Sequence, residues 1–288
     1  MKPAPFEYHA PRTLDEVLER LAQAGEDAKL LAGGQSLVPA MNFRLARPKV
    51  LIDLGRVHEL DYVRDADGGL AIGALVRQRA VERSEAVRRA APLLAEAVPF
   101  VGHPTIRNRG TVGGSLAHAD PAAELPAVVA ALEADLVIAG PRGRRVAKPS
   151  EFFVSYLTTS LRPDEVLIEI RLPRAAPGTR SAFVEFARRH GDFAIVGVAL
   201  ALDVDDAGAC RTARVALAGV GPGPVRAVQA ERCLAGQVVT DALIREAAGI
   251  AAKEIDPPSD LHATSHYRRR LAVVLVEDAA RRALGRSA

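Results

Sequence analysis

Two glycine pairs constrain this sequence more than any other feature. Gly33-Gly34 and Gly113-Gly114 each follow a β-branched or aliphatic run, and a serine comes within two residues of each pair. Glycine at a sharp turn leaves backbone N–H groups uncovered, so an anion can approach them. The helix expected to start at Ser36 adds the positive end of its dipole, and Ser115 adds a hydroxyl donor. A single glycine turn usually does no more than end a strand or helix. Two such turns in adjoining units predict two sets of backbone N–H groups, or cradles, that bind one diphosphate from both sides.

Neither pair fits the GxxxxGK or GxGxxG nucleotide motifs. The 288 residues are 49% hydrophobic and 25% charged, which is typical of a soluble globular protein with a large core. The net charge of +3 is spread along the chain and argues against nucleic-acid binding. Cys210 and Cys233 are the two cysteines and have no metal-ligand spacing, so redox chemistry here requires an organic cofactor.

No apolar run approaches the length of a membrane span, and the N-terminus lacks the apolar core of a signal peptide. The sequence therefore predicts a cytoplasmic protein. The histidines are dispersed, and none lies at a recognisable catalytic spacing from a serine, aspartate or cysteine. We predict no catalytic residue and no metal ligand in this chain.

A first small α/β unit is expected over residues 1–57. Thr13 and Glu16 form a capping box that starts a helix, and Gly25 ends it. The strand "AKLLA" leads to the first glycine pair, and Ser36 is expected to cap a helix that runs to Arg44. The segment "KVLIDL" then predicts a buried strand.

A second unit is expected over residues 58–176. It contains the strand "GLAIGAL", one helix through "SEAVRRAAPLLAEAV" and the second glycine pair. Asp120-Pro121 predicts a helix start, and a hairpin follows that helix. In "EVLIEIRLP", alternation puts Val166, Ile168, Ile170 and Leu172 on one face of a half-buried strand.

The last unit, residues 177–288, differs in its order of elements, since its strands come first and its helices follow. Three long strands, "AFVEFARRH", "FAIVGVALALDV" and "ARVALAGVG", precede helices expected over 225–234, 241–255 and 265–284. This order predicts a three-stranded antiparallel sheet backed by helices, so the whole chain belongs to the α+β class. The arginines of the last helix are expected to face water, with a protein interface as the alternative.

Four segments carry a resemblance to a known family: "AGGQSLVPAMNFRLARP", "TIRNRGTVGGSLAHADPAAELPAVVAAL", "LRPDEVLIEIRLP" and "RRHGDFAIVGVAL". In order and from about Tyr8 to Leu284, the chain resembles the FAD-binding medium subunit of the molybdenum hydroxylases. This group includes the carbon monoxide dehydrogenase medium subunit and the xanthine dehydrogenase FAD domain. The resemblance implies a two-subdomain FAD-binding domain of the PCMH type, followed by a C-terminal domain of the carbon monoxide dehydrogenase flavoprotein type.

The resemblance also implies that FAD is bound noncovalently, with its diphosphate and ribityl between the two glycine loops. The residues implied in the first loop are Lys29, Leu30, Leu31, Ala32, Gly33, Gly34, Gln35, Ser36 and Leu37. Those implied in the second loop are Thr111, Gly113, Gly114 and Ser115.

Six residues outside the loops are implied to lie near the cofactor. Asp120 and Glu124 match acceptors on the adenosine side, although Asp120 can equally be a helix cap. Val101 matches a position near the adenine, and Leu161 matches one whose backbone lies near the isoalloxazine ring. Asp192-Phe193 match a segment that shields one ring face, although Phe193 can equally be a core aromatic.

The implied function is electron transfer within a heterotrimeric complex. A molybdopterin-binding large subunit oxidises the substrate, an iron–sulfur small subunit passes electrons on, and FAD here reduces an external acceptor. The cysteine-bearing loop of the benzoyl-CoA-reductase-like variety is missing. One alternative is a self-sufficient FAD oxidase or dehydrogenase of the vanillyl-alcohol oxidase type. Another is a flavin-free scaffold.

Overall fold

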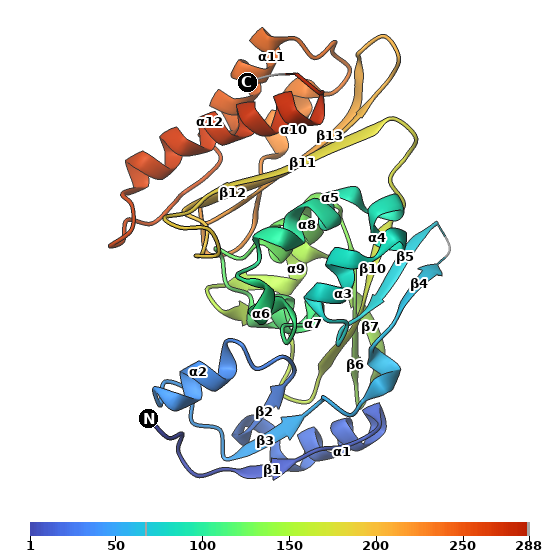
Figure 1. Ribbon diagram of the computed structural model, residues 1–288, viewed down its shortest axis with the longest axis vertical. Coiled ribbons are helices and arrows are strands. Elements are labelled where there is room, and N and C mark those ends of the chain that lie inside the picture. Colours follow the sequence, from blue (N-terminus) through green and yellow to red (C-terminus); the bar gives the residue numbers. More distant parts are fainter. Residues whose placement is uncertain (67, 287–288) are drawn as a thin grey trace.

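The computed structural model describes residues 1–66 and 68–286, which form three large sheets stacked along the long axis of the molecule, together with one two-stranded hairpin (Figure 1). The N-terminal sheet is parallel and has the order β1-β3-β2. Its elements and their short helices are β1 (Glu7–His9), α1 (Leu14–Ala24), η1 (Gly25–Asp27), β2 (Ala28–Leu31), α2 (Leu37–Asn42), β3 (Val50–Asp53) and η2 (His58–Leu60).

Helix α1 begins and ends as its sequence predicts. The Thr13 side chain accepts a hydrogen bond from the Glu16 amide, and the Gly25 amide donates to Leu21 O. The Glu16 carboxylate accepts from the Arg12 amide at 2.7 Å rather than from Thr13. Helix α2 differs more, because it ends at Asn42 and Ser36 occupies the N-cap position without a side-chain cap bond.

The middle sheet has five antiparallel strands in the order β4-β5-β10-β6-β7. They are β4 (Val63–Ala66), β5 (Gly69–Gly73), β6 (Asp135–Gly140), β7 (Gly143–Ala147) and β10 (Val166–Pro173). A β-bulge between Leu167 and Glu169 changes the face to which the following residues point. Ile168 therefore packs in the N-terminal core, the cluster that contains Val17 and Ile52. Ile170 and Leu172 pack in the middle core, the cluster that contains Leu94 and Leu125. The prediction that all three share one face is wrong, because alternation assumes an uninterrupted strand.

Short helices cover this sheet. They are α3 (Gln78–Arg83), α4 (Glu85–Ala90), α5 (Pro92–Ala97), η3 (Val98–Phe100), α6 (Pro104–Arg107), α7 (Val112–His118), α8 (Glu124–Ala131) and α9 (Pro149–Phe152), with a hairpin of β8 (Phe153–Ser155) and β9 (Thr158–Thr159). The single helix predicted through "SEAVRRAAPLLAEAV" is split, because Ala91 precedes Pro92 and leaves the α region.

The helix predicted to start at Asp120-Pro121 begins instead at Glu124, with Ala123 at its N-cap. Asp120 Oδ1 accepts a hydrogen bond from the Ala122 amide at 2.9 Å. The aspartate thus closes a local turn ahead of the helix rather than capping it.

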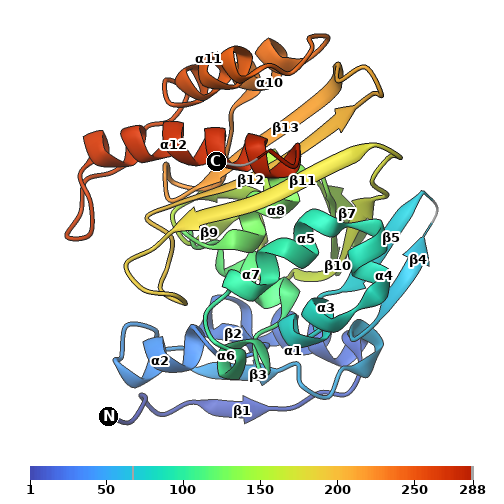
Figure 2. The same ribbon diagram turned by 45° about the horizontal axis from the view of Figure 1, so that its top comes forward.

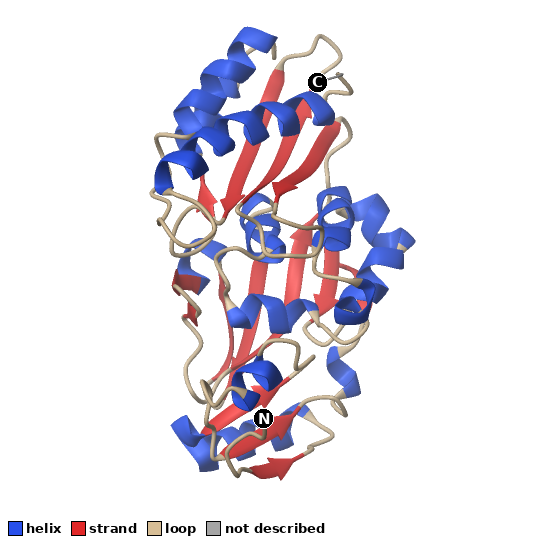
Figure 3. Cartoon of the chain, turned by 60° about the vertical axis from the view of Figure 1, so that its left-hand side comes forward, coloured by secondary structure: helices blue, strands red, loops and turns tan. Residues whose placement is uncertain are grey.

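The C-terminal sheet is antiparallel, and a two-residue fourth strand extends the three predicted ones. The elements are β11 (Thr179–Phe186), β12 (Val196–Val204), β13 (Cys210–Ala218), β14 (Val225–Arg226), α10 (Val228–Leu234), α11 (Asp241–Ala251) and α12 (Ser265–Ala283). Helices α10 to α12 lie on one side of this sheet (Figure 3).

The other face of the C-terminal sheet packs against α5 and α8 of the middle unit (Figure 2). Phe183, Ala199 and Ala216 point from this face into the middle core, whereas Val198 and Val215 point toward the helices. Residues 191–195, in the connection from β11 to β12, line the same cavity as Asp120 and Pro121 of the middle unit. Within the described residues, no helix is long and apolar enough to cross a membrane.

Candidate functional site

The first glycine loop leaves its backbone amides free. The N–H groups of residues 33–36 form no hydrogen bond to any described residue, while Gly34 O accepts from the Val38 amide at 3.1 Å. Gly34 has φ +73°, a left-handed conformation that glycine adopts without strain. Gln35 Nε2 donates to Gly33 O at 3.1 Å and holds the loop in shape. Consecutive free amides at one turn form a concave set of donors suited to an anion.

The second glycine pair lies in the first turn of helix α7 rather than at the end of a strand. Thr111 is the N-cap, and its Oγ1 accepts from the Gly114 amide at 3.0 Å. The Gly113 amide donates to Ala74 O at 2.9 Å, and the Ser115 amide donates to Thr111 O at 3.2 Å. Because these three amides are already bonded, they do not form the second backbone cradle that the sequence predicted.

Both glycines of this second pair are required by packing. A Cβ added to Gly113 would lie 2.5 Å from Ala74 Cβ and 2.7 Å from Ala74 O. A Cβ on Gly114 would lie 2.7 Å from Thr111 Oγ1 and 3.4 Å from Ala32 Cβ. The missing side chains therefore let α7 approach the end of β5 and let its first turn approach the first glycine loop.

The two loops meet, as the prediction of one shared site requires. A Cβ on Gly33 would overlap Arg109 O and lie 2.7 Å from Gly110 Cα. The Arg77 guanidinium also donates to Arg109 O and holds this backbone segment in place. Segments almost eighty residues apart thus touch beside helices α2, α6 and α7 (Figure 2).

Three basic residues belong to the segments around this junction. Lys29, Arg77 and Arg109 form no ion pair within residues 1–66 and 68–286. Lys29 belongs to the strand that enters the first loop, and Arg77 bonds to the segment on which Gly33 packs. Free amides next to unpaired cations favour a polyanionic ligand over a neutral one.

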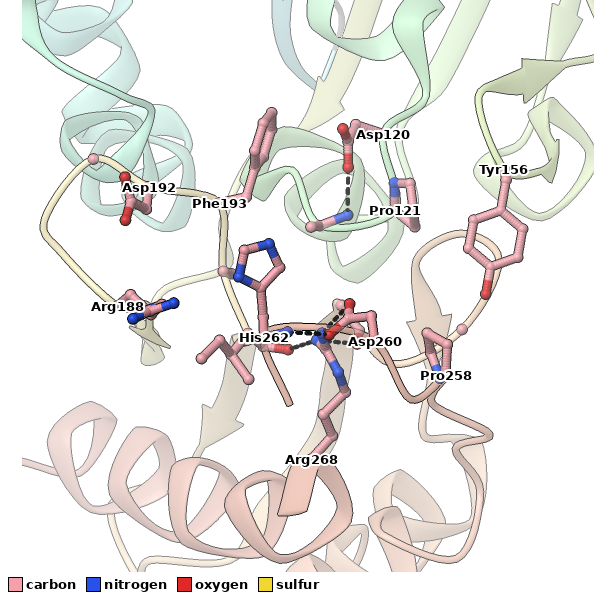
Figure 4. A pocket seen from close by; sticks show the side chains of 16 residues that line it. Asp120, Pro121, Tyr156, Arg188, Asp192, Phe193, Pro258, Asp260, His262 and Arg268 are labelled. Atoms are coloured by element: carbon pink, nitrogen blue, oxygen red, sulfur yellow. Dashed lines mark hydrogen bonds and ion pairs between the residues drawn. The ribbon is translucent and has the colours of Figure 1, made fainter. Parts of the chain in front are cut away.

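A cavity of about 590 Å³ lies at the other end of α7, between the middle and C-terminal units (Figure 4). Three of the residues named from the sequence line it: Asp120, Asp192 and Phe193. Phe193 is 61% exposed, which excludes the alternative that it is a core aromatic. Tyr156 and His262 also line the cavity, and no sequence signal distinguished them from surface residues.

The remaining predicted residues lie outside the cavity lining. Val101 is buried in a loop whose carbonyls at Pro99, Val101 and Gly102 accept hydrogen bonds from Arg107 Nη1. Leu161 packs partly buried against the middle core, and its amide donates to Thr159 Oγ1 at 3.3 Å.

Glu124 is 4% exposed, and burial raises the pKa of its carboxyl to about 7, with a smaller contribution from the charge of Asp120. Across the boundary between the units stands Glu185 on β11, whose pKa is raised to about 8 by burial and by Glu124. Glu185 Oε2 is buried and has no hydrogen-bond partner among the described residues. The sequence did not single out Glu185, because nothing in a strand pattern marks which polar residue meets a carboxylate from another unit.

The site has two parts: the first glycine loop with its free amides and neighbouring basic residues, and the 590 Å³ cavity at the other end of α7. Together they suit an elongated anionic cofactor. In agreement, residues 4–175 match the family model described as the FAD binding domain in molybdopterin dehydrogenase. Residues 181–283 match the CO dehydrogenase flavoprotein C-terminal domain. The chain belongs to this family of flavoprotein subunits.

Individual relatives span the whole chain. It is 41% identical to the 6-hydroxypseudooxynicotine dehydrogenase complex subunit alpha of Paenarthrobacter nicotinovorans, over all of this chain and 97% of the relative. A solved carbon monoxide dehydrogenase chain from Hydrogenophaga pseudoflava superimposes with TM-score 0.96 and 40% identity, covering both chains fully. Quinoline 2-oxidoreductase from Pseudomonas putida 86 gives TM-score 0.93 and 37% identity over 99% of each chain.

Proposed function

We propose that this chain is the FAD-binding subunit of a heterotrimeric molybdenum hydroxylase and passes electrons from a partner's iron–sulfur clusters to an external acceptor. The observation that carries the proposal is the first glycine loop, where four consecutive amides have no partner among the described residues and the Arg77 guanidinium bonds to the adjoining Arg109 carbonyl. Lys29 and Arg109 belong to the flanking segments. The FAD diphosphate is the polyanion that this family's cofactor would present to these groups. The Thr111 and Ser115 hydroxyls stand on the neighbouring α7 turn as further donors.

The spacing of the two parts of the site suits an elongated dinucleotide. Helix α7 has seven residues, so its two ends lie about 10 Å apart at 1.5 Å per residue. The glycine junction is at its start, and Asp120, which lines the cavity, follows its end. We infer that the diphosphate lies at the junction and the isoalloxazine ring lies at the cavity, beside Phe193. This proposal places Asp120 beside the ring rather than on the adenosine side that the resemblance implies.

Within this proposal the chain's residues bind and orient the cofactor rather than perform acid–base chemistry. When bound, FAD supplies the ability to accept electrons singly and release them in pairs. Phe193 covers one side of the ring, while Asp120 and Asp192 offer acceptors at the rim of the cavity. Glu124, with its raised pKa, is proposed as a cofactor ligand that can also donate when protonated.

Two observations support placing substrate oxidation in a partner subunit. No cluster of three or more histidine, cysteine, aspartate or glutamate side chains among the described residues could hold a metal ion. The names of the relatives mention compounds as different in size as carbon monoxide, quinoline and 6-hydroxypseudooxynicotine. One FAD subunit type serving such different substrates fits a division of labour between subunits.

The test uses the purified chain. We expect a flavin spectrum, release of FAD by acid or heat, and reduction by dithionite, with no flavin reduction by organic substrates. Addition of matching large and small subunits should restore substrate-dependent flavin reduction. Rapid reduction of the isolated chain by an organic substrate would favour the self-sufficient oxidase, and purified protein that neither carries nor takes up FAD would favour the scaffold.

A further inference from the structure

Arg268 does not face water as the sequence pattern suggested. It lies near the start of α12 and is only 4% exposed. Its Nη1 donates to Ile195 O and, at 3.1 Å, to Gly219 O, while its Nη2 donates to Asp260 Oδ2 at 2.7 Å. In Figure 4 the side chain extends from its helix to the segment that carries Phe193. One guanidinium thus joins three separate segments of the C-terminal unit.

The 590 Å³ cavity is lined by these segments together with Asp120 and Pro121 of the middle unit. Ile195 follows Phe193 by two residues, so its carbonyl anchors the wall that carries this ring. The Gly219 amide donates to Pro121 O at 2.8 Å, which ties the Arg268 hub to the wall formed by Asp120 and Pro121. The arginine is therefore bonded directly to one wall and through a single residue to the other.

Gly219 makes this double attachment possible. Its φ is +76°, and a Cβ at this position would lie 2.5 Å from Ile195 O. Any other residue would push apart the two carbonyls that Arg268 gathers. Glycine is required here because the backbone is left-handed and its Cα lies against the Ile195 carbonyl, just before β12.

The arrangement has a cost that a simple space-filling side chain would avoid. Arg268 Nε is buried and finds no hydrogen-bond partner in the described chain, and an unsatisfied buried donor is destabilising. Lysine offers a single charged point, whereas the planar guanidinium presents donors in fixed directions to several acceptors at once. The geometry uses that property, since its acceptors come from three segments.

We propose that Arg268 is a positioning residue that fixes Phe193 relative to Asp120 and Pro121, and so sets how closely Phe193 covers the flavin ring. The inference rests on the proposed function for the presence of the ring in the cavity. It requires no contact between Arg268 and the cofactor. The role of Arg268 is to hold the segment that carries Phe193 at a fixed position relative to Asp120 and Pro121 before the cofactor binds.

The first test measures how far bound flavin is shielded. Iodide quenching of flavin fluorescence and visible circular dichroism are compared for wild type, Arg268→Met, Phe193→Ala and the double variant. We expect Arg268→Met to raise iodide quenching about as much as Phe193→Ala, with little further increase in the double variant. Arg268→Lys should lie between wild type and Arg268→Met. The control Arg270→Met changes an exposed residue of the same helix and should leave quenching unchanged.

Additive effects of the two substitutions, or unchanged quenching in Arg268→Met, would overturn the proposal. If Arg268→Met does not fold, the comparison of Arg268→Lys with Arg270→Lys decides the same question. Faster quenching in Arg268→Lys alone supports the role, and equal quenching in both contradicts it.

The second test does not depend on the flavin. Hydrogen exchange on cofactor-free protein reports the Ile195 amide, which donates to Phe186 O, and the Gly219 amide, which donates to Pro121 O. We expect both to exchange faster in Arg268→Met or Arg268→Lys than in the matching Arg270 variant, while β13 remains protected. Unchanged exchange overturns the positioning role even if FAD binds. If the purified protein neither carries nor takes up FAD, the proposed function is overturned. The hydrogen-exchange result then still decides whether Arg268 fixes the cavity walls.

Discussion

The first glycine loop offers four backbone N–H groups without a partner in the described chain, whereas the amides of Gly113, Gly114 and Ser115 are all hydrogen-bonded. In the first loop the absence of side chains leaves donors open to a ligand. In the second it allows a helix to pack closely on Ala74 and on the first loop. Similar sequence signatures thus leave amides free in one place and are used for helix capping and close packing in the other.

The largest effect should come from overpacking the second pair. Gly113→Val places a branched side chain 2.5 Å from Ala74 Cβ inside the core, so we expect a loss of about 3 kcal/mol in unfolding free energy. Denaturant unfolding of cofactor-free protein measures it, because the effect is on packing and not on binding. A loss that appears only when FAD is present would remove the distinction between the two pairs.

Gly33→Val should reduce affinity as well as stability. Its Cβ would overlap Arg109 O and lie 2.7 Å from Gly110 Cα, so the half-buried loop must shift, displacing amides that each contribute about 1.5–3 kcal/mol when bonded to a charged group. We expect FAD to bind at least about tenfold more weakly, since 1.4 kcal/mol corresponds to tenfold. Equilibrium titration of apoprotein with FAD measures this. Gly249→Val is the control, because a Cβ there meets nothing within 4 Å.

Thr111→Ala tests the cap that occupies the Gly114 amide. Loss of an N-cap side chain costs about 1 kcal/mol, and the freed amide should not bind FAD more tightly because the hydroxyl donor is lost with the cap. Thermal unfolding of Thr111→Ala beside Thr111→Ser separates the hydroxyl from the methyl group. Tighter FAD binding in Thr111→Ala would show that the second pair is a blocked cradle rather than a packing element.

Ser36→Ala should have the smallest effect on stability. Ser36 occupies an N-cap position, but its side chain makes no cap bond, so we expect a change within about 0.5 kcal/mol. The same thermal unfolding experiment gives the comparison with Thr111→Ala. A cost near 1 kcal/mol would show that Ser36 caps α2 in solution and that the two loops are more alike than their hydrogen bonds indicate.

Local signals in the sequence predicted local structure well. The ends of α1 followed from Thr13 and Gly25, because capping depends on a few neighbouring residues. The antiparallel C-terminal sheet followed from long apolar strands and short turns. The family and its FAD-binding domain followed from the resemblance, and the family models confirm both.

Three of the failures share a different cause, since each of these three depends on contacts between distant segments. The bulge at Leu167–Glu169 arises from pairing with β6, which a single-strand pattern does not contain. The Gly113 amide is occupied by Ala74 O, 39 residues earlier in the chain. Arg268 belongs to a run of three arginines that look equivalent until the sheet beneath α12 is in place. The roles assigned to individual cofactor-binding residues stay predictions.

The C-terminal sheet, buried on both faces, has a consequence for how the molecule unfolds. Its Phe183, Ala199 and Ala216 face belongs to the core of the middle unit, while its Val198 and Val215 face belongs to its own helices. The predicted boundary near residue 176 therefore separates segments of sequence that share one hydrophobic core. Detaching residues 177–288 would expose an apolar sheet face, so the two segments should melt in a single cooperative transition rather than one after the other.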